Sequence, residues 1–318
     1  MLWVFVLAAL AALGLWLAHR FGVRFPGVEA PKVVTGFRRR ARGIIFGKSS
    51  PYTVKYSPTK AEGHVAVWGG SGTGKTSAVL IPTLSAWDGH IFCIDIAGDI
   101  SSNVDMPAKL EYRPDDPDSI PFNVFGTIDQ CEEDSERWER LERLAFLILP
   151  DKPGGDGDGA AEFFRVEARK MLTAALICHH ENGFDFIEIC EKIVGASWRD
   201  FLNEIASQGN EKANQFIRSF SGASEKNNAG CKQALDTAVK LFATNENIKK
   251  TIRRPMDGEA FFAPRVLESN SVFVVVSDAK LALYAPLLQI ITAQVLDYFS
   301  ERPPKKTTKI LIPSCREP

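Results

Sequence analysis

The sequence predicts an α/β fold that is interrupted by a block of helices. A β-rich run at 64–68 leads into a glycine-rich loop and a helical segment, and a second apolar run follows at 91–96. Strand character returns only at 271–276, after a long stretch with helical periodicity. Two strands joined by one helix form a βαβ unit, which is the beginning of a parallel sheet. The helical block is therefore expected to be an insertion into a sheet domain.

The elements of the sheet domain follow from short apolar runs. Residues 64–68 (HVAVW) and 91–96 (IFCIDI) are predicted strands. Residues 76–86 are a predicted helix in which Pro82 forces a kink or an early end. The stretch 107–121 is rich in proline and aspartate and is expected to be loop. The carboxyl end completes the domain with a strand at 271–276, a helix at 283–299 and a last strand at 309–312.

The helical block is predicted from apolar residues that recur at three- and four-residue spacing. Its expected helices cover 131–149, 160–179, 184–194, 198–207, 213–220 and 231–242. The glycine-rich stretch DKPGGDGDGA at 151–160 separates the first two. Asp156 and Asp158 in this stretch resemble part of a calcium loop. Because the other ligand positions are missing, a connector is expected there.

Composition and charge indicate a globular protein with one basic end. The 318 residues are 45% hydrophobic and 24% charged, which suits packed domains rather than a disordered chain. Residues 1–60 carry ten Lys or Arg against one acid, and the rest of the chain carries 28 against 38. Six cysteines form no C-x-x-C pair, which excludes a readable zinc or redox motif and favours reduced thiols.

The first eighteen residues, MLWVFVLAALAALGLWLA, carry no charge. As a helix they would be roughly 27 Å long, close to one bilayer core, so a transmembrane anchor is predicted over 1–18. A cleavable signal peptide and a buried core helix are the alternatives, but Trp3 and Trp16 near the two ends fit membrane interfaces better. By the positive-inside tendency, the basic juxtamembrane segment 19–60 then places the following chain in the cytoplasm. Its FRRRAR run is expected to face lipid headgroups, with nucleic-acid contact as the alternative.

The loop GGSGTGKT at 69–76 matches the G-x-x-x-x-G-K-[ST] pattern in full, between a predicted strand and a predicted helix. Its glycines allow backbone N–H groups to surround phosphates, and the lysine reaches the outer phosphate oxygens. The sequence therefore predicts ATP and Mg²⁺ as cofactors, with Thr76 as a Mg²⁺ ligand. A glycine-rich turn that binds nothing is the alternative. The predicted nucleotide-binding residues are Gly69, Gly70, Ser71, Gly72, Thr73, Gly74, Lys75, Thr76 and Ser77.

Hydrolysis also needs an acid to hold magnesium and a group to orient the attacking water. Asp95, at the end of the second predicted strand, is a candidate for this catalytic role. The alternative for Asp95 is a strand-end cap or a group that supports the site indirectly. Asp99 is expected to cap a helix or order the loop.

Several ordered motifs resemble the coupling proteins of type IV secretion and conjugation, the TraG/TraD-like membrane ATPases. The P-loop with its GKT is followed by LIPTL at 80–84, as in the family's loop and helix. DIAGD at 95–99 resembles the element after the family's second strand, and PFNVF at 121–125 resembles the start of its all-helical domain. RGIIFGK at 42–48 and YAPLLQIITAQVL at 284–296 are similar to segments ahead of the P-loop and before the last core strand.

This resemblance implies a RecA-like P-loop core with an inserted all-α domain. The core would comprise 61–126 and 261–318, with the all-α domain at 127–260. It further implies a homo-oligomer, a hexameric ring in the family, that is anchored at the inner membrane and uses ATP to move cargo. The implied partners are DNA and relaxase, the relaxosome, and components of the type IV secretion channel.

Basic residues at 245–255 (NENIKKTIRRP) invite two interpretations. Arg253 and Arg254 are conceivable arginine fingers for a neighbouring subunit, but no finger is assigned. With Lys232 and Lys240 the run could also contact nucleic-acid phosphates. The alternative is a solvated basic face, which charge runs usually are.

The last predicted strand departs from the family pattern. An Asp-Glu pair is expected directly after it, but KILI at 309–312 is followed by PSCREP. Relatives also usually have two membrane helices, whereas one is predicted here. These departures suggest a truncated or disrupted gene copy, or a protein that binds nucleotide without efficient turnover. The isolated chain is expected to have ATPase activity near background.

The sequence leaves two alternatives to an ATP-binding coupling protein. A non-catalytic interaction protein would use the helical block to dock relaxase or channel components, with a vestigial P-loop. A small-molecule kinase is the other reading. The long helical insertion and the membrane helix ahead of the loop argue against a kinase.

Overall fold

The computed structural model describes residues 34–37, 43–57, 65–70, 72–96, 98–151, 159–302 and 310–313. The predicted membrane helix at 1–18 and the connector at 152–158 lie outside these residues. By its internal contacts the chain divides into two compact units, residues 1–68 and residues 69–318. The boundary between the basic segment and the P-loop core stays a prediction at residue 60.

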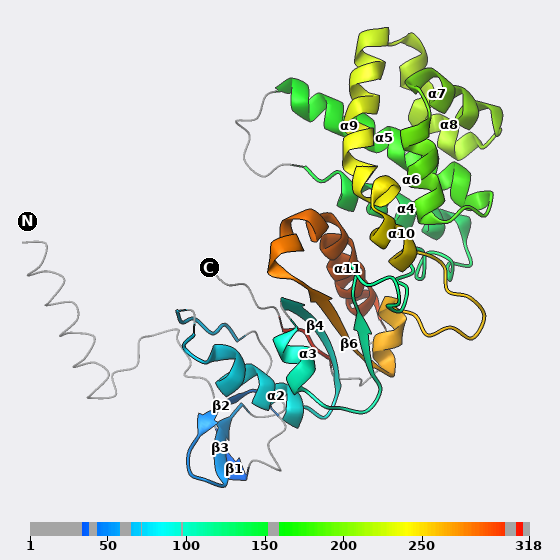
Figure 1. The fold of residues 1–318 in the computed structure, drawn as a ribbon. Helices are drawn as coiled ribbons and strands as arrows, with labels where there is room; N and C mark the ends of the chain where they lie inside the picture. The colour runs from blue at the N-terminus through cyan, green and yellow to red at the C-terminus, as the bar shows by residue number, and fades with distance from the viewer. Residues whose placement is uncertain are drawn as a thin grey trace, which may run out of the picture. The chain divides into compact units, whose positions relative to one another are not determined.

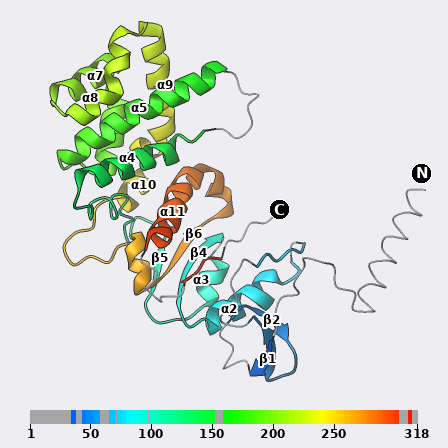
Figure 2. The same ribbon diagram turned by 180° about the vertical axis from the view of Figure 1, so that it is seen from behind.

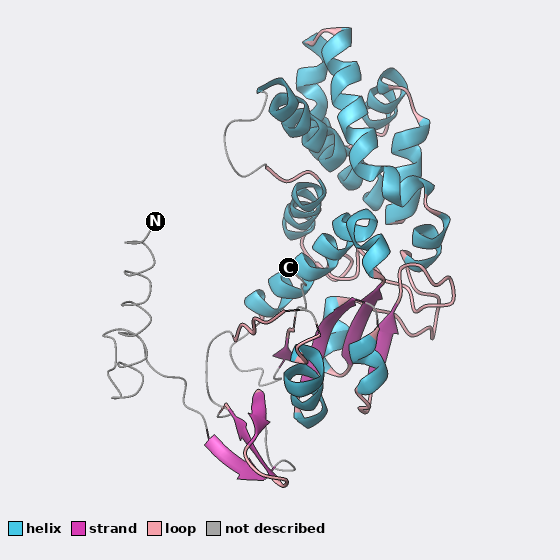
Figure 3. Cartoon of the chain, turned by 60° about the vertical axis from the view of Figure 1, so that its left-hand side comes forward, coloured by secondary structure: helices cyan, strands magenta, loops and turns pink. Residues whose placement is uncertain are grey.

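The described part of the first unit holds a three-stranded antiparallel sheet (Figures 1 and 3). Its strands are β1 (Val34–Phe37), β2 (Ile45–Lys48) and β3 (Thr53–Tyr56), and β3 is the central strand. The β2–β3 turn is closed by a hydrogen bond of 2.8 Å from the Ser49 amide to the Thr53 carbonyl. Sequence analysis treated this region only as a basic segment and did not predict the sheet, because such short strands give little periodicity.

The strand predicted at 64–68 is wrong in its described part. Residues 65–68 are irregular, and Val65 and Trp68 are 45% and 88% exposed. A strand needs a neighbour for its backbone N–H and C=O groups. In the described part of the second unit β4 (His90–Ile96) lies between two other strands, and no ladder reaches 65–68. Apolar alternation alone did not make this run a strand.

The second unit contains a parallel sheet in the order β5-β6-β4-β7. Its strands besides β4 are β5 (Lys109–Tyr112), β6 (Ser271–Val276) and β7 (Ile310–Leu311). The strands predicted at 91–96, 271–276 and 309–312 are thus confirmed. The loop predicted at 107–121 is wrong over β5, whose four residues pair with β6 from Lys109 opposite Ser271. The strand has only four residues, and the prolines and aspartates that follow it give the whole stretch the sequence pattern of a loop.

Alternate residues of the buried strand β6 enter two separate cores. Phe273 and Val275 join Leu84 of α2 (Ile81–Ala86) and Ile100 of α3 (Asp99–Asn103). Val272, Val274 and Val276 lie in the other core with Leu287 and Ile291 of α11 (Leu281–Glu301). Both faces of the sheet are therefore covered, as expected for parallel strands with continuous apolar runs (Figure 2).

Among the described residues, one helix is long and apolar enough to cross a membrane by length and composition, the segment Asp278–Glu301 that includes α11. In this structure 39% of its most apolar window is buried, and Tyr284, Leu287 and Val295 of α11 pack in the core of the second unit. Here α11 serves as a covering helix of the sheet, which matches the helix predicted at 283–299.

The helical block lies between β5 and β6 in the chain and forms one group of helices (Figure 1). All the helices predicted for it are found, and α9 begins earlier than predicted because Ser224 accepts a hydrogen bond from the Asn227 amide and caps it. The short helix α10 was not predicted. The bounds are α4 (Asp134–Ile148), α5 (Gly159–Glu181), α6 (Phe186–Gly195), α7 (Trp198–Ser207), α8 (Glu211–Ile217), the 3-10 turn η3 (Arg218–Gly222), α9 (Glu225–Thr244) and α10 (Glu246–Thr251).

The two chain segments that connect the insertion to the sheet domain lie side by side. The Phe122 amide donates to the Thr251 carbonyl at 2.8 Å, and the Asn123 amide donates to the Phe262 carbonyl at 3.0 Å. The rings of Phe122 and Phe262 are 5.2 Å apart, and both side chains are fully buried. We call this region, 121–123 with 251–252 and 262, the neck. Its geometry shows that the helical block is an insertion, as predicted.

Candidate nucleotide-binding site

The described residues of the P-loop curl as the glycine pattern requires. Gly72 and Gly74 have φ angles of 72° and 83°, in the left-handed region where a side chain would be strained. The Thr73 hydroxyl donates to the Gly70 carbonyl at 2.8 Å and closes the turn. The Ala78 amide donates to the Gly74 carbonyl at 2.7 Å, so a helical turn begins directly at the loop. This curled backbone ahead of a helical turn suits phosphate binding through N–H groups.

Lys75 folds back across the loop. Its ammonium donates to the carbonyls of Gly69 and Gly70 at 2.6 and 2.8 Å. The structure therefore brings Gly69, Gly70, Gly72, Thr73, Gly74 and Lys75 together in one turn, followed at once by Thr76 and Ser77; Ser71 lies outside the described residues. The Lys75 ammonium beside the glycine turn would attract the negatively charged oxygens of a triphosphate.

The helix after the loop starts with a wide turn. Thr76–Leu80 is a π-helical turn, in which the Ile81 amide donates to the Thr76 carbonyl, and α2 continues to Ala86. Pro82 has no N–H to donate to the preceding turn and stands in the first positions of α2, where proline is tolerated. The predicted helix to residue 86 is confirmed, and the expected disturbance by Pro82 takes the form of this wide turn.

Asp95 is fully buried at the end of β4 and caps α3. Its two carboxylate oxygens accept hydrogen bonds from the amides of Ile100 and Ser101, at 3.3 and 2.7 Å. Gly98, with a φ angle of 83°, turns the chain between the strand and the helix, and Asp99 is the first residue of α3. This arrangement matches the capping alternative for Asp95. A catalytic role for Asp95 remains a prediction from the sequence.

We expect Asp95→Asn to lower the free energy of unfolding by about 1–2 kcal/mol, because an amide keeps only one of the two acceptors that hold α3. Chemical denaturation would measure the loss. If Asp95 only caps α3, the affinity for ATP–Mg²⁺ should stay within twofold of the wild type. A large loss of metal-dependent affinity at unchanged stability would instead assign Asp95 to the magnesium site.

Three basic residues of the run, Lys249, Arg253 and Arg254, are paired with carboxylates. Lys249 contacts Glu191 and Glu246 at 2.8 and 3.0 Å, and Arg253 binds both oxygens of Glu259. The buried Lys232 pairs with Asp236 at 2.5 Å. These carboxylates offset the charge of the run, which favours a structural role over contact with nucleic-acid phosphates.

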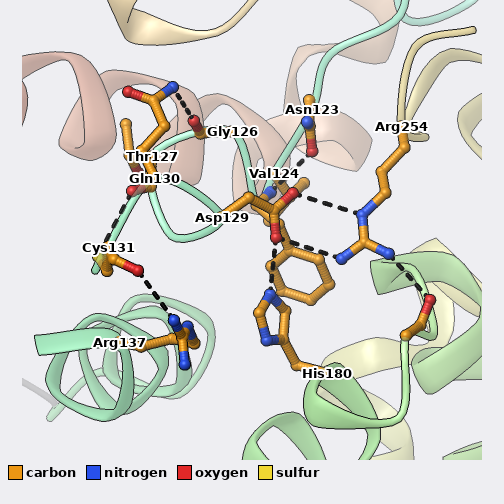
Figure 4. A network of polar contacts seen from close by, with 12 residues as sticks. Asn123, Val124, Gly126, Thr127, Asp129, Gln130, Cys131, Arg137, His180 and Arg254 are labelled. Carbon is orange, nitrogen blue, oxygen red and sulfur yellow. Dashed lines mark hydrogen bonds and ion pairs between the residues drawn. The ribbon is translucent and has the colours of Figure 1, made fainter. Parts of the chain in front are cut away.

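Arg254 belongs to a polar network at the base of the insertion (Figure 4). The Asp129 carboxylate accepts from His180 Nε2 at 2.8 Å and from the Arg254 guanidinium at 3.2 Å. Arg254 also donates to the Gly183 carbonyl at 2.9 Å. The Phe125 ring lies edge-on to His180 and beneath the guanidinium. Arg254 is thus engaged within its own chain, and no arginine finger is assigned.

Asp129 and His180 were missed by sequence analysis. Asp129 precedes α4 in an irregular segment, and His180 lies at the end of the apolar helix α5. Neither residue belongs to a recognisable motif, and only the fold brings them together. The only signal in the sequence was a pair of histidines in an apolar helix, which is commoner in cores than in sites.

The Asp129 network should make stability depend on pH. Burial favours the protonated form of Asp129, but the hydrogen bonds from His180 and Arg254 outweigh it and lower the pKa of the carboxyl. A lowered folded-state pKa stabilises the fold above the unfolded value of about 3.9, and this stabilisation is lost as pH falls through the folded pKa.

The stability difference between the wild type and Asp129→Asn is therefore expected to be full near pH 6 and to shrink below about pH 4. Urea titrations at several pH values would measure it. The exposed residue Glu132 provides the control, since Glu132→Gln should change stability little at any pH. A difference that does not vary between pH 3 and pH 6 would contradict the role given to Asp129.

In the ranges that the structure describes, no group of three or more His, Cys, Asp or Glu residues is placed to hold an ion. The described cysteines are buried, and burial raises the pKa of the Cys178 and Cys231 thiols to about 11. These thiols are therefore protonated at neutral pH, which makes them weak ligands and nucleophiles.

The structure is an α/β sheet domain that carries a P-loop motif and a helical insertion, and the sequence as a whole identifies its family. Residues 29–311 match the model of the family described as "Type IV secretory system Conjugative DNA transfer". The chain belongs to this family. The coupling-protein resemblance predicted from the motifs is thereby confirmed.

Curated relatives are similar over part of their length. The chain is 23% identical over 280 residues to "Protein VirD4" of Agrobacterium fabrum, which covers 84% of this chain and 41% of the relative. It is 25% identical over 173 residues to the "Type IV secretion system-coupling protein VirD4" of Bartonella quintana, which covers 50% of this chain and 27% of the relative. The chain thus spans less than half the length of these relatives.

Solved structures with the same fold include the plasmid coupling protein TrwB. Its complex with the GTP analogue GDPNP matches with a TM-score of 0.58 at 15% identity, over 77% of this chain and 54% of TrwB. Its complex with ADP and Mg²⁺ matches with a TM-score of 0.57 at 14% identity, over 76% of this chain and 54% of TrwB. At this identity the match shows a shared fold.

Proposed function

We propose that this chain is an ATP-binding coupling protein of a conjugation or type IV secretion system that links relaxase-bound DNA to the secretion channel. The observation that carries the proposal is the P-loop. It has the complete motif, left-handed glycines at 72 and 74, and a lysine folded over the turn, within a chain of the conjugative DNA transfer family. The ligand would be a nucleoside triphosphate with Mg²⁺.

The P-loop residues have distinct roles in this proposal. Backbone N–H groups of Gly72 to Thr76 would bind the phosphates, and the Lys75 ammonium would leave the Gly69 and Gly70 carbonyls to contact the outer phosphate oxygens. The Thr76 hydroxyl would bind magnesium. Complexes of TrwB with ADP and Mg²⁺ and with ATP and GTP analogues support this choice of ligand by analogy of fold.

Calorimetric titration of the detergent-purified chain with ATP and GTP in magnesium buffer tests the proposal. We expect saturable binding of one nucleotide per chain, and binding should weaken when magnesium is chelated. If circular dichroism shows the fold intact and neither nucleotide produces heat of association, the proposed function fails.

We further propose that the chain is anchored at the bacterial inner membrane and assembles as a homo-oligomer. The uncharged segment 1–18, followed by basic residues, supports the anchor. Fractionation of cells that express the chain should place it with the inner membrane, and removal of residues 1–18 should release it. Recovery of the intact chain in the soluble fraction would contradict the anchor.

For the 318-residue chain we expect ATP hydrolysis near background. Hydrolysis needs an acid beside magnesium, whereas both oxygens of the buried candidate acid Asp95 are engaged by α3. A steady-state phosphate-release assay measures this. A rate well above background that Lys75→Ala abolishes would refute it.

A non-catalytic docking protein is the second candidate function. The neck makes this candidate testable, because its two chain connections lie side by side. Phe122 and Phe262 lie together, so the helical insertion between them can be removed and its ends rejoined. If docking is the whole function, loss of the insertion should abolish capture of relaxase or channel components while Lys75→Ala leaves capture unchanged. If nucleotide binding is required, both variants should lose function.

A further inference from the structure

One hydrophobic core contains residues of both the helical insertion and the sheet domain. Two contacts between these parts differ in character. One is the neck, whose side chains Phe122, Thr251, Ile252 and Phe262 are fully buried and whose backbone groups are hydrogen-bonded across the two connections. The other is the contact between α4 of the insertion and α11 of the sheet domain. This second contact is named the α4–α11 contact.

Two ion pairs bridge α4 and α11 at the α4–α11 contact. Arg140 binds Glu301 at 2.8 Å and Arg143 binds Asp297 at 3.2 Å. In each pair one side chain is well exposed, at 55% for Glu301 and 49% for Arg143, and its partner is partly buried. Exposed ion pairs contribute little to stability and are screened by salt. This contact is therefore much easier to break than the neck.

The packing between the two helices is also incomplete. A cleft of about 470 Å³ lies between them, lined by both ion pairs and by Leu144, Leu147 and Gln294. Gln294 donates to the Val124 carbonyl at 2.9 Å, but its own Oε1 is buried without a hydrogen-bond partner in the part of the chain that the structure describes. An unpartnered buried acceptor opposes this arrangement. A small rotation that admits water would satisfy it.

We propose that the α4–α11 contact is a reversible, salt-sensitive tie that sets the angle of the helical insertion about the neck. The neck remains formed in both positions because its contacts are apolar and buried. Breaking the two arginine pairs opens the cleft, hydrates Gln294 and lets the insertion rotate. Residues of α11 share one core with the buried strand β6, so the tie holds the insertion against the sheet domain.

Spin labels at Ser277→Cys in the sheet domain and Ser207→Cys in the insertion would report the angle, since both positions are exposed and the native cysteines of the described chain are buried. We expect the distance distribution between the labels to shift or broaden in the double variant Arg140→Glu, Arg143→Glu. Raising NaCl from 50 to 500 mM should cause a similar change in the wild type.

A charge exchange separates pairing from general damage. Adding Glu301→Arg and Asp297→Arg to the double variant should restore the wild-type distribution. Arg199→Glu is the matched control, because Arg199 forms an exposed pair with Glu225 inside the insertion and should leave the distances unchanged. An unchanged distribution in the double variant, or a change that the exchange does not reverse, would overturn the proposal. ATP binding should be equal in all these variants, so the result is independent of the proposed function.

Discussion

Replacing Lys75 with alanine should weaken the binding of ATP–Mg²⁺ by about ten- to a hundredfold. Lys75 is the one cation of the P-loop turn, and its ammonium already lies over the carbonyls of Gly69 and Gly70. Hydrogen bonds to charged groups contribute about 1.5–3 kcal/mol each, and about 1.4 kcal/mol corresponds to a tenfold change in affinity. Calorimetry with the purified variant measures the loss directly.

Stability should change little in this variant, because the lysine contacts only its own loop. Lys240→Ala is a suitable control, since Lys240 is an exposed lysine on α9. It should bind nucleotide as the wild type does. Equal affinities for the Lys75 and Lys240 variants would mean that the P-loop does not hold the triphosphate.

Replacing Phe262 with alanine should cost about 3–5 kcal/mol in the free energy of unfolding, the range for large buried aromatic side chains. Phe262 is fully buried, and its ring lies 5.2 Å from Phe122, 6.1 Å from Phe92 and 6.2 Å from Tyr112. These residues come from the first connection of the insertion and from strands β4 and β5. One side chain thus joins the neck to the sheet.

Urea denaturation followed by circular dichroism would measure this loss. Phe163→Ala is the matched control, because Phe163 is 46% exposed on α5 and should cost far less. The sheet domain and the insertion share Phe262, so a second, earlier transition is expected if the variant uncouples them. A loss no greater than that of the control would show that the aromatic neck does not stabilise the fold.

The site was predictable to different degrees at different residues. The P-loop was read from the sequence because its function needs glycine, lysine and threonine at set spacing, and that requirement is local. The sequence gives two possible roles for Asp95, because a capping aspartate and a magnesium-binding aspartate have the same sequence pattern at a strand end. Only the positions of the Ile100 and Ser101 amides, on the following helix, show that it caps α3. Asp129, His180 and Arg254 carry no local pattern.

The elements divide in the same way. The buried strand β6 and helix α7 were predicted at their observed bounds, because continuous apolar residues and helical periodicity are properties of the segment itself. Residues 65–68 have a comparable apolar pattern but no strand partner, and β5 has a partner but a weak pattern. Strand pairing is a contact between distant segments, so short strands cannot be judged from their own residues.

The sequence by itself determined the class of fold, the insertion of a helical block, the P-loop and the family. Each depends on residue types at fixed spacing along one segment. The tertiary structure decided the pairing of the basic residues, the capping role of Asp95, the aromatic neck and the ion pairs between α4 and α11. Those features join residues that are far apart in the chain. The effect of a charged or apolar side chain depends on its neighbours, and the fold determines which residues these are.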